Sequence, residues 1–265
     1  MSSNSNSVNV IEEWTSRPDG VEIYTKKWMS VIDPPIATVV FLHGFGDHVN
    51  RFNHVFERFA LKGVEVLGFD QRGFGKTAVR NKNPGHTGGW KIVTGDITGF
   101  LLANRRQNIP QFLFGHSMGG GLAANYASDG PEKDNLAGIV LSSPLIALAP
   151  QARVPKSAVT LANALSKVIP NLTVPVMSLD KKYISRNPKE IERYQNDELI
   201  HRIGSLRGLA DINYVMELMI LMLQKNSLIK FLLKKKTWRE WSGFYHEMHH
   251  EDEDIRSLMI ILIGS

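Results

Sequence analysis

The feature that most constrains this chain lies near its middle, where a short apolar run meets a serine flanked by glycines. Residues 111–114 suit a buried strand, Gly115-His116-Ser117-Met118-Gly119 follows at once, and residues 119–128 have the pattern of a helix. The two glycines allow a sharp turn between strand and helix. Such a turn holds the serine in an exposed, strained conformation beside the positive end of the helix. The segment therefore predicts a nucleophilic serine at the end of a buried strand.

Apolar runs and helical patterns alternate along the first 145 residues, which predicts a mostly parallel sheet with helices on both faces. Residues 8–14 and 21–28 alternate in polarity around a turn, Arg17-Pro18-Asp19-Gly20, and indicate an opening hairpin. Continuous apolar runs are typical of strands that are buried on both faces. The predicted core strands are 36–42, 64–69, 111–114 and 136–141, and the predicted helices are 53–62, 90–106 and 119–128. The predicted fold class is α/β.

The alternation stops after Pro144, and this change divides the chain. Residues 146–205 hold five prolines between short helical patches, of which residues 155–169 form an amphipathic pattern. We expect a helical cap inserted into the sheet domain, not a further sheet layer, and a return of the α/β alternation near Gly204. The predicted organisation is a disordered lead over 1–7, a first core part over 8–145, the cap over 146–205 and a second core part over 206–265.

Composition excludes several classes of protein. The chain has 265 residues, of which 43% are hydrophobic and 22% charged, as in a globular protein. It contains no cysteine, so disulfides, thiolate catalysis and cysteine-based metal sites are excluded. The net charge of +5 is mild, and we expect no nucleic-acid partner. The chain shows neither a signal peptide nor a membrane span, so we expect it in the cytoplasm, with peripheral contact to membranes or lipid droplets as the further option.

A second glycine-rich turn, His43-Gly44-Phe45-Gly46, follows the predicted strand 36–42. In enzymes whose serine stands at a strand-to-helix turn, the loop at this place gives one backbone N–H to the oxyanion. The residue after the nucleophile gives the other. The two donors are then Phe45 and Met118. Each such donor is worth about 3 kcal/mol in the transition state, and two correctly ordered motifs favour catalysis over an idle turn.

Three motifs together carry a resemblance to a known family. His43-Gly44-Phe45-Gly46-Asp47-His48, Phe69-Asp70-Gln71-Arg72-Gly73-Phe74-Gly75 and Gly115-His116-Ser117-Met118-Gly119-Gly120-Gly121 resemble the monoacylglycerol lipase group of α/β-hydrolases. This group is often classed with the serine aminopeptidase S33 domain, and the chain is most similar to its fungal members. The resemblance runs from about residue 12 to 210 and resumes near 237. It implies an α/β-hydrolase fold, hydrolysis of monoacylglycerols or related lipid monoesters, an apolar cap over the site, and covalent chemistry without a metal or organic cofactor.

The general base of such an enzyme is a histidine that follows the last core strand. His246, His249 and His250 are the candidates by position. The family pattern Gly-x-Tyr-His matches Gly243-Phe244-Tyr245-His246, so the resemblance assigns the role to His246. This residue would take the proton of Ser117 and pass it to the leaving alcohol. A metal site formed by the three histidines lacks a recognised spacing.

The acid of the catalytic triad is missing from the chain as written. The family places an aspartate within His-Gly-x-x-Asp, and this position falls near Met219 and Ile220. Asp211, Glu217 and Asp252 are the available substitutes, and none of them stands in the motif. In well-studied triads the loss of the acid's function lowers turnover by about 10⁴.

Residues 211–236 and 257–265 are where the chain departs from the family. One coding sequence for His-Gly-Thr-Asp-Asp-Thr-Asp-Val-Thr, read one base later, encodes Met216 to Leu223 and begins Gln224. A shifted reading of residues 259–265 gives Asp-Tyr-Ile-Asn-Trp-Ile, which resembles the last helix of the family. We favour frame slips or wrong exon boundaries in the gene model. The rival hypothesis is a basic segment over 215–236 that docks on membranes.

Three functions stay open at the level of sequence. The first is a lipid-ester hydrolase, either a monoacylglycerol lipase or a lysophospholipase-like esterase. The second is a serine peptidase of the proline iminopeptidase kind, which would need acidic cap residues to hold a free amino terminus. The cap carries acidic residues at Glu190, Glu192, Asp197 and Glu198, and a solvated charged face explains them as well. The third is a catalytically impaired α/β-hydrolase that lacks the triad acid.

Overall fold

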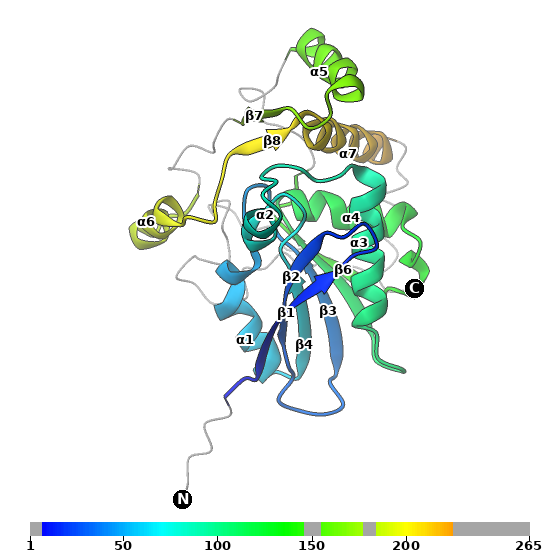
Figure 1. Ribbon diagram of the computed structural model, residues 1–265. Helices are drawn as coiled ribbons and strands as arrows, with labels where there is room; N and C mark the ends of the chain where they lie inside the picture. Colours follow the sequence, from blue (N-terminus) through cyan, green and yellow to red (C-terminus); the bar gives the residue numbers. More distant parts are fainter. Residues whose placement is uncertain (1–6, 146–154, 177–183, 225–265) are drawn as a thin grey trace, which may run out of the picture.

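A six-stranded sheet forms the centre of the molecule (Figure 1). The computed structural model describes residues 7–145, 155–176 and 184–224. The strands lie in the order β1-β2-β4-β3-β5-β6; β3 to β6 pair in parallel, and β1 and β2 are antiparallel at one edge. Their bounds are β1 Val10–Ser16, β2 Glu22–Trp28, β3 Ala37–Leu42, β4 Val64–Phe69, β5 Gln111–His116 and β6 Gly138–Ser142. The predicted α/β class with a mostly parallel sheet is confirmed.

Helices cover both faces of this sheet (Figure 1). On one face of the sheet, Phe41 of β3 belongs to the core cluster that includes residues of α1. On the other face, Leu42 of β3 belongs to the cluster that includes residues of α3 and α4. Successive side chains of a strand point to opposite faces, so one buried strand feeds both clusters. The helices are α1 Asn53–Leu61, α2 Gly75–Asn81, α3 Trp90–Ala103 and α4 Met118–Asp129, with short 3₁₀ turns η1 Val49–Phe52 and η2 Lys133–Asn135.

Phe41 is the centre of the aromatic core beneath α1. Its ring centroid lies 4.4 Å from that of Phe52, 4.7 Å from that of Phe56 and 5.1 Å from that of Phe114. Tilted and edge-on pairs of this kind add about 0.5–1.5 kcal/mol each beyond the area that they bury. This cluster anchors β3 and β5, the two strands whose carboxyl ends lead into the glycine-rich turns.

The predicted elements of the first 145 residues are confirmed, with differences of a few residues at their ends. The opening hairpin forms as β1 and β2, in register from Val10 opposite Trp28 to Ser16 opposite Glu22. Gly63, the predicted stop of the first helix, follows α1 with a φ of +86°, which suits a residue without a Cβ.

The chain between β6 and α7 lies at the carboxyl ends of the parallel strands, above the sheet in Figure 1. Its described residues form two helices and a two-stranded antiparallel sheet of β7 and β8. The elements are α5 Lys156–Val168, β7 Thr173–Pro175, α6 Pro188–Asn196 and β8 Ile203–Ser205, followed by α7 Leu206–Gln224. In the described parts of this region, residues 155–176 and 184–205, no strand joins the central sheet, and the division into core and cap stays a prediction. No helix in the described ranges has the length and apolar character needed to cross a bilayer.

The described residues after the cap differ from the sequence prediction. The α/β alternation was expected to resume near Gly204, but β8 pairs with β7 and α7 then continues to Gln224. Apolar residues recur along this stretch without the alternation of a half-buried strand, and Val215 and Met216 are buried. α7 packs against α4 of the core and α5 of the cap.

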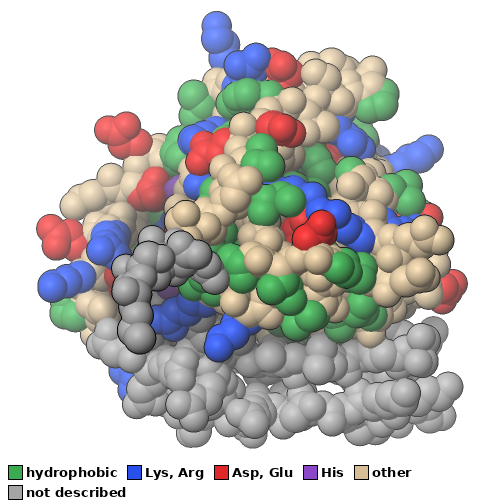
Figure 2. Space-filling view, turned by 90° about the horizontal axis from the view of Figure 1, so that it is seen from below, with side chains coloured by type: hydrophobic (Ala, Val, Ile, Leu, Met, Phe, Trp, Pro, Cys, Tyr) green, Lys and Arg blue, Asp and Glu red, His purple; other side chains and the backbone are tan. Residues whose placement is uncertain are grey.

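The surface seen from below in Figure 2 shows charged side chains of both signs interspersed with apolar ones. Scattered apolar residues are normal on a soluble face. Charge therefore singles out no docking region on this side of the described molecule.

Candidate active site

Ser117 stands at the turn between β5 and α4, in a backbone conformation that few residues adopt. Its φ is +51° and its ψ is −118°. Its amide donates to the carbonyl of Ser142 at 3.0 Å, and its own carbonyl accepts from the amides of Gly121 (3.1 Å) and Leu145 (2.8 Å). Such strain costs about 1–3 kcal/mol and persists where the surrounding structure fixes it. The structure therefore has the strained turn that the sequence predicted.

The glycines that flank the serine are required by close approaches of the backbone. A Cβ on Gly115 would lie 2.1 Å from the carbonyl oxygen of Gly119. A Cβ on Gly119 would lie 2.1 Å from the carbonyl oxygen of Leu42, at the end of β3. The absence of both side chains lets the start of α4 pack directly on the carboxyl ends of β5 and β3. This packing is what places Ser117 at the mouth of the sheet.

The loop after β3 lies against the serine, as the sequence motifs predicted. A Cβ on Gly44 would lie 3.2 Å from the Cβ of Ser117 and 3.7 Å from its Oγ. Phe45 is the next residue along this loop, and Met118 is the first residue of α4. The N–H groups of the first helical turn have no partner within the helix. The structure thus brings Gly44 and Ser117 together, although the two motifs are far apart in sequence, and the donor roles of Phe45 and Met118 stay predictions.

His43 fixes the start of this loop from inside the protein. Its Nδ1 lies 2.8 Å from the carbonyl oxygen of Gly44, and its Nε2 accepts the amide hydrogen of Gln71 at 2.9 Å. The side-chain amide of Gln71 donates in turn to the His43 carbonyl at 2.8 Å. This arrangement requires a neutral ring with its proton on Nδ1. Complete burial lowers the pKa of His43 to about 4, which favours the same neutral form.

Asp70 holds the neighbouring turns and does not act on the serine. It is fully buried, and its carboxylate accepts the amide hydrogens of Val49 (2.8 Å) and Lys76 (2.7 Å). A Cβ on Gly75 would lie 2.3 Å from its Oδ2. Burial raises the pKa of Asp70 to about 6. Asp70 lies within the motif Phe69-Asp70-Gln71-Arg72-Gly73-Phe74-Gly75, and its position directly after a buried strand is the sequence signal for a structural role at this edge of the sheet.

Two proposed acids, Asp211 and Glu217, lie on α7, and neither is placed in a triad by the described contacts. Asp211 pairs with Arg207 at 3.4 Å, while its Oδ2 is buried and has no hydrogen-bond partner among the described residues. Burial raises the pKa of Asp211. Glu217 is exposed. The family position near Met219 and Ile220 falls in the last part of α7, inside a helix rather than at the end of a strand.

The other expected triad members lie outside the described residues. These are the proposed base His246, its neighbours His249 and His250, and Asp252. Their roles stay predictions. In the ranges that the structure does describe, no group of three or more histidine, aspartate or glutamate residues could hold a metal ion.

A small cavity lies next to Met118, the residue after Ser117. We call the turn at Ser117, between β5 and α4, the elbow. The volume of the cavity is about 30 Å³, and its lining includes the apolar residues Phe74, Trp90, Met118, Ile212 and Val215 together with the polar residues Gln71, Arg72, Thr87 and Asp211. A space of this size accommodates a water molecule but not an acyl chain.

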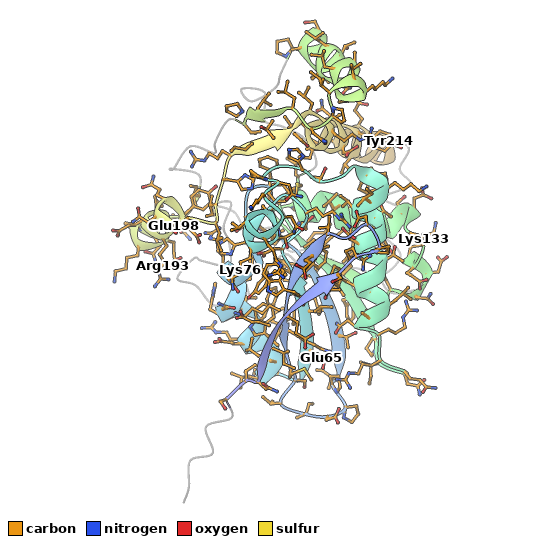
Figure 3. All side chains as sticks on the ribbon, in the orientation of Figure 1. Glu65, Lys76, Lys133, Arg193, Glu198 and Tyr214 are labelled. Carbon is orange, nitrogen blue, oxygen red and sulfur yellow. The ribbon has the colours of Figure 1, made fainter. Side chains whose placement is uncertain are left out.

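The acidic cap residues do not converge on a site for a free amino group. Glu190 accepts a hydrogen bond from Arg193 at 2.8 Å, and Asp197 pairs with His48 at 2.8 Å. Glu192 and Glu198 are exposed. Arg193 and Glu198 both lie at α6, away from the central sheet (Figure 3). Glu190 and Asp197 are thus held by basic partners, and Glu192 and Glu198 face solvent, so these contacts give no support to an amine-binding site.

Comparisons with known proteins agree with this geometry. The family model for serine aminopeptidase S33 matches residues 33–233. A proposed monoglyceride lipase of Schizosaccharomyces pombe is 34% identical over 87% of this chain, and the monoacylglycerol lipase of Mycolicibacterium smegmatis is 30% identical over 72% of it. The chain spans 67% and 65% of the lengths of these two relatives.

Solved structures show the same relationship. The monoacylglycerol lipase of Paleococcus ferrophilus superposes with a TM-score of 0.72 at 29% identity, over 88% of this chain and 93% of that one. A soluble variant of monoglyceride lipase from Saccharomyces cerevisiae, bound to a substrate analogue, gives a TM-score of 0.68 at 28% identity over 85% and 72%. Sequence and structure together support a lipid-ester hydrolase, and the chain belongs to the serine aminopeptidase S33 family of α/β-hydrolases.

Proposed function

We propose that this chain is a serine hydrolase of lipid monoesters, with monoacylglycerols as the preferred class and lysophospholipids as the related one. The observation that carries the proposal is the strained turn at Ser117 with the loop of Gly44 and Phe45 against it. The names of the relatives support the substrate class, because several of them are monoglyceride or monoacylglycerol lipases.

The proposed reaction runs through an acyl-enzyme. The Oγ of Ser117 attacks the ester carbonyl, and the backbone N–H groups of Phe45 and Met118 stabilise the negative charge on the carbonyl oxygen. The bond to the alcohol breaks as His246 passes it the proton taken from the serine, and glycerol leaves. Water then attacks the acyl-enzyme, its proton goes to His246, and the fatty acid leaves with Ser117 restored.

Covalent labelling separates an active enzyme from an impaired one. We expect a fluorophosphonate probe to label the folded protein, and we expect Ser117→Ala to abolish labelling while folding normally. Failure of the wild-type chain to label would favour the catalytically impaired alternative, which the helical α7 at the family's acid position also supports.

A substrate panel then separates the two kinds of enzyme. We expect the fatty acid to be released from monoacylglycerols faster than proline is released from prolyl arylamides, because the cap acids are paired or exposed. Faster cleavage of the prolyl substrates would establish the peptidase alternative. Lysophospholipids in the same panel show how strictly the leaving alcohol is selected.

The cap also supports a peripheral contact with membranes or lipid droplets by a cytoplasmic protein. α5 lies at the top of the molecule in Figure 1, where it packs against α7. Apolar side chains are exposed on it and just after it, at Leu161, Leu165, Val168, Ile169 and Leu172. An amphipathic helix with such a face lies in the interface of a bilayer rather than across it.

Vesicle flotation tests this contact. We expect the protein to float with vesicles of phosphatidylcholine and phosphatidylserine, and we expect Val168→Glu combined with Leu161→Glu to release it. Ser157→Glu adds a carboxylate at another exposed position of α5 and is the matched control. Equal flotation of all three proteins would exclude α5 as the contact.

A further inference from the structure

The end of the cap is anchored across the loops that support the proposed oxyanion donors. Residues 197–205, which we call the cap strap, run from the end of α6 through β8. His201 lies in the middle of the strap, next to the loop of Gly46 on one side and the turn of Gly73 on the other. The strap is distant from both loops in sequence, so the contacts are tertiary ones.

The backbone of His201 contacts Gly46, the residue after the donor Phe45. The amide of His201 donates to the carbonyl of Gly46 at 3.3 Å. A Cβ on Gly46 would lie 2.2 Å from the carbonyl oxygen of His201, and Gly46 has a φ of +70°. Only a glycine permits this approach. The oxyanion loop and the strap therefore fit each other at the level of the backbone.

The side chain of His201 contacts the second loop. Its Nε2 lies 2.7 Å from the carbonyl oxygen of Gly73, and its Nδ1 accepts the amide hydrogen of Ile203 at 3.3 Å. These partners require a neutral ring that carries its proton on Nε2 and donates to Gly73. One residue of the cap thus holds two separate loops of the core.

Phe74 completes the connection between His201 and the donor residue. The His201 ring stacks on Phe74 at 5.5 Å with an interplanar angle of 12°. Phe74 is fully buried and meets the ring of Phe45 edge-on at 5.2 Å. A change at His201 therefore reaches Phe45 both through the backbone at Gly46 and through the packed ring of Phe74.

We propose that His201 is a positioning residue that sets the oxyanion loop, so that a docked cap strap aims the N–H of Phe45 at the developing oxyanion. The effect on catalysis rests on the proposed function, whereas the statement that His201 holds the loop of Gly46 in place rests on the contacts alone. His48 reinforces the strap from the same loop, because its Nε2 lies 2.8 Å from Oδ2 of Asp197. A cap that lifts from the core would then weaken the oxyanion hole as it opens the site.

The test compares His201→Ala with His201→Gln, which keeps an amide donor at the reach of Nε2. Removal of an oxyanion donor costs about 10²–10³ in kcat, so a displaced donor should cost about tenfold. We expect His201→Ala to lower kcat for a monoacylglycerol about tenfold with KM changed less than twofold, and His201→Gln to recover most of the loss. Arg202→Ala, an exposed neighbour on the strap, is the matched control.

Amide hydrogen exchange gives a second readout that does not depend on activity. We expect the amides of residues 44–47 to exchange faster in His201→Ala than in the wild type, with no change in β3 or α4. Unchanged exchange there, or a rise in KM with kcat intact, would overturn the inference. An inactive wild-type chain would instead disprove the proposed function, while the exchange result would still decide whether His201 holds the loop.

Discussion

Around Ser117 the sequence motif, the secondary structure and the backbone geometry agree with one another, whereas along α7 the sequence prediction and the observed structure differ. Around Ser117, the glycine motif, the strand and helix bounds, the strained φ and the close approach of Gly44 all support one geometry. Along α7, a helix with buried Val215 and Met216 stands where the family has a strand followed by an aspartate. Agreement between levels is the mark of a sequence that specifies its structure.

This difference shows that lineage and activity depend on separate parts of the chain. The family match covers residues 33–233, and the turn at Ser117 and the loop of Gly44 and Phe45 both lie within its first part, before residue 145. The predicted base and the predicted positions of the acid fall after residue 205, where the structure describes only α7. A chain can therefore carry the family's nucleophile geometry without carrying its full catalytic set.

The prediction with the largest effect concerns the missing acid. We expect the transcript to differ from the chain across residues 211–236, and we expect the corrected protein to contain His-Gly-x-x-Asp. Loss of the acid's function costs about 10⁴ in turnover, so the corrected chain should exceed the present one by about that factor. Transcript sequencing and steady-state kinetics of both proteins measure this. An uninterrupted match of the transcript to residues 211–236 would show that the segment is encoded as written and would exclude a frame slip there.

A pair of substitutions tests whether stability is concentrated in the elbow region. Phe41→Ala removes a fully buried ring that contacts three others, and such losses cost about 3–5 kcal/mol. Tyr214→Ala removes a ring that is 49% exposed on α7 (Figure 3), and should change the free energy of unfolding by less than about 0.5 kcal/mol. Denaturant unfolding measures both, and equal losses would contradict the comparison.

The pH dependence of stability should report on the oxyanion loop through His43. Its pKa is lowered by burial from 6.5 to about 4 in the folded protein, so the unfolded chain binds more protons between these values. Stability is then fully present above about pH 6.5 and falls, by up to roughly 3 kcal/mol, as pH drops to 4. His43→Gln lacks this contribution, so the free energy of unfolding of the variant should rise relative to that of the wild type as pH falls from 7 to 4.

Asp70 acts in the opposite direction and needs its own variant. Its pKa is raised by burial from 3.8 to about 6, so the folded protein binds more protons in that window and gains stability as pH falls through it. The wild type shows the sum of the two effects. Asp70→Asn should therefore steepen the loss of stability toward pH 4. A flatter curve for this variant would show that folding does not raise the pKa of Asp70.

The sequence predicted the elbow and the first half of the fold because those elements are local. A glycine motif, a buried apolar run and a helix-terminating residue such as Gly63 can each be recognised from residues that are adjacent in the sequence. The cap strap was not predicted, because its contacts from Asp197 to His48 and from His201 to Gly73 join residues that are far apart in the chain. The acidic cap residues showed only charge in the sequence, and their partners required the fold.

The glycines of the elbow should be far less tolerant than a glycine on a helix surface. Gly119→Ala would place a Cβ 2.1 Å from the carbonyl oxygen of Leu42 and should destabilise the protein by about 3 kcal/mol, at the upper end of overpacking costs. The same change should displace Ser117 and reduce fluorophosphonate labelling. A variant of normal stability and normal labelling would show that α4 can shift without disturbing the nucleophile.

Gly95→Ala is the matched change with the smallest expected effect and the opposite sign. Gly95 lies inside α3 and is exposed, and nothing lies within 4 Å of the position that its Cβ would take. An alanine loses less conformational entropy than a glycine in a helix, so the variant should be more stable by about 0.5–1 kcal/mol, with labelling unchanged. Thermal or denaturant unfolding measures the gain. A loss of stability in Gly95→Ala would mean that helix propensity does not determine the effect of an alanine even where space is free. The difference between Gly95 and Gly119 would then not be explained by the space available for a Cβ.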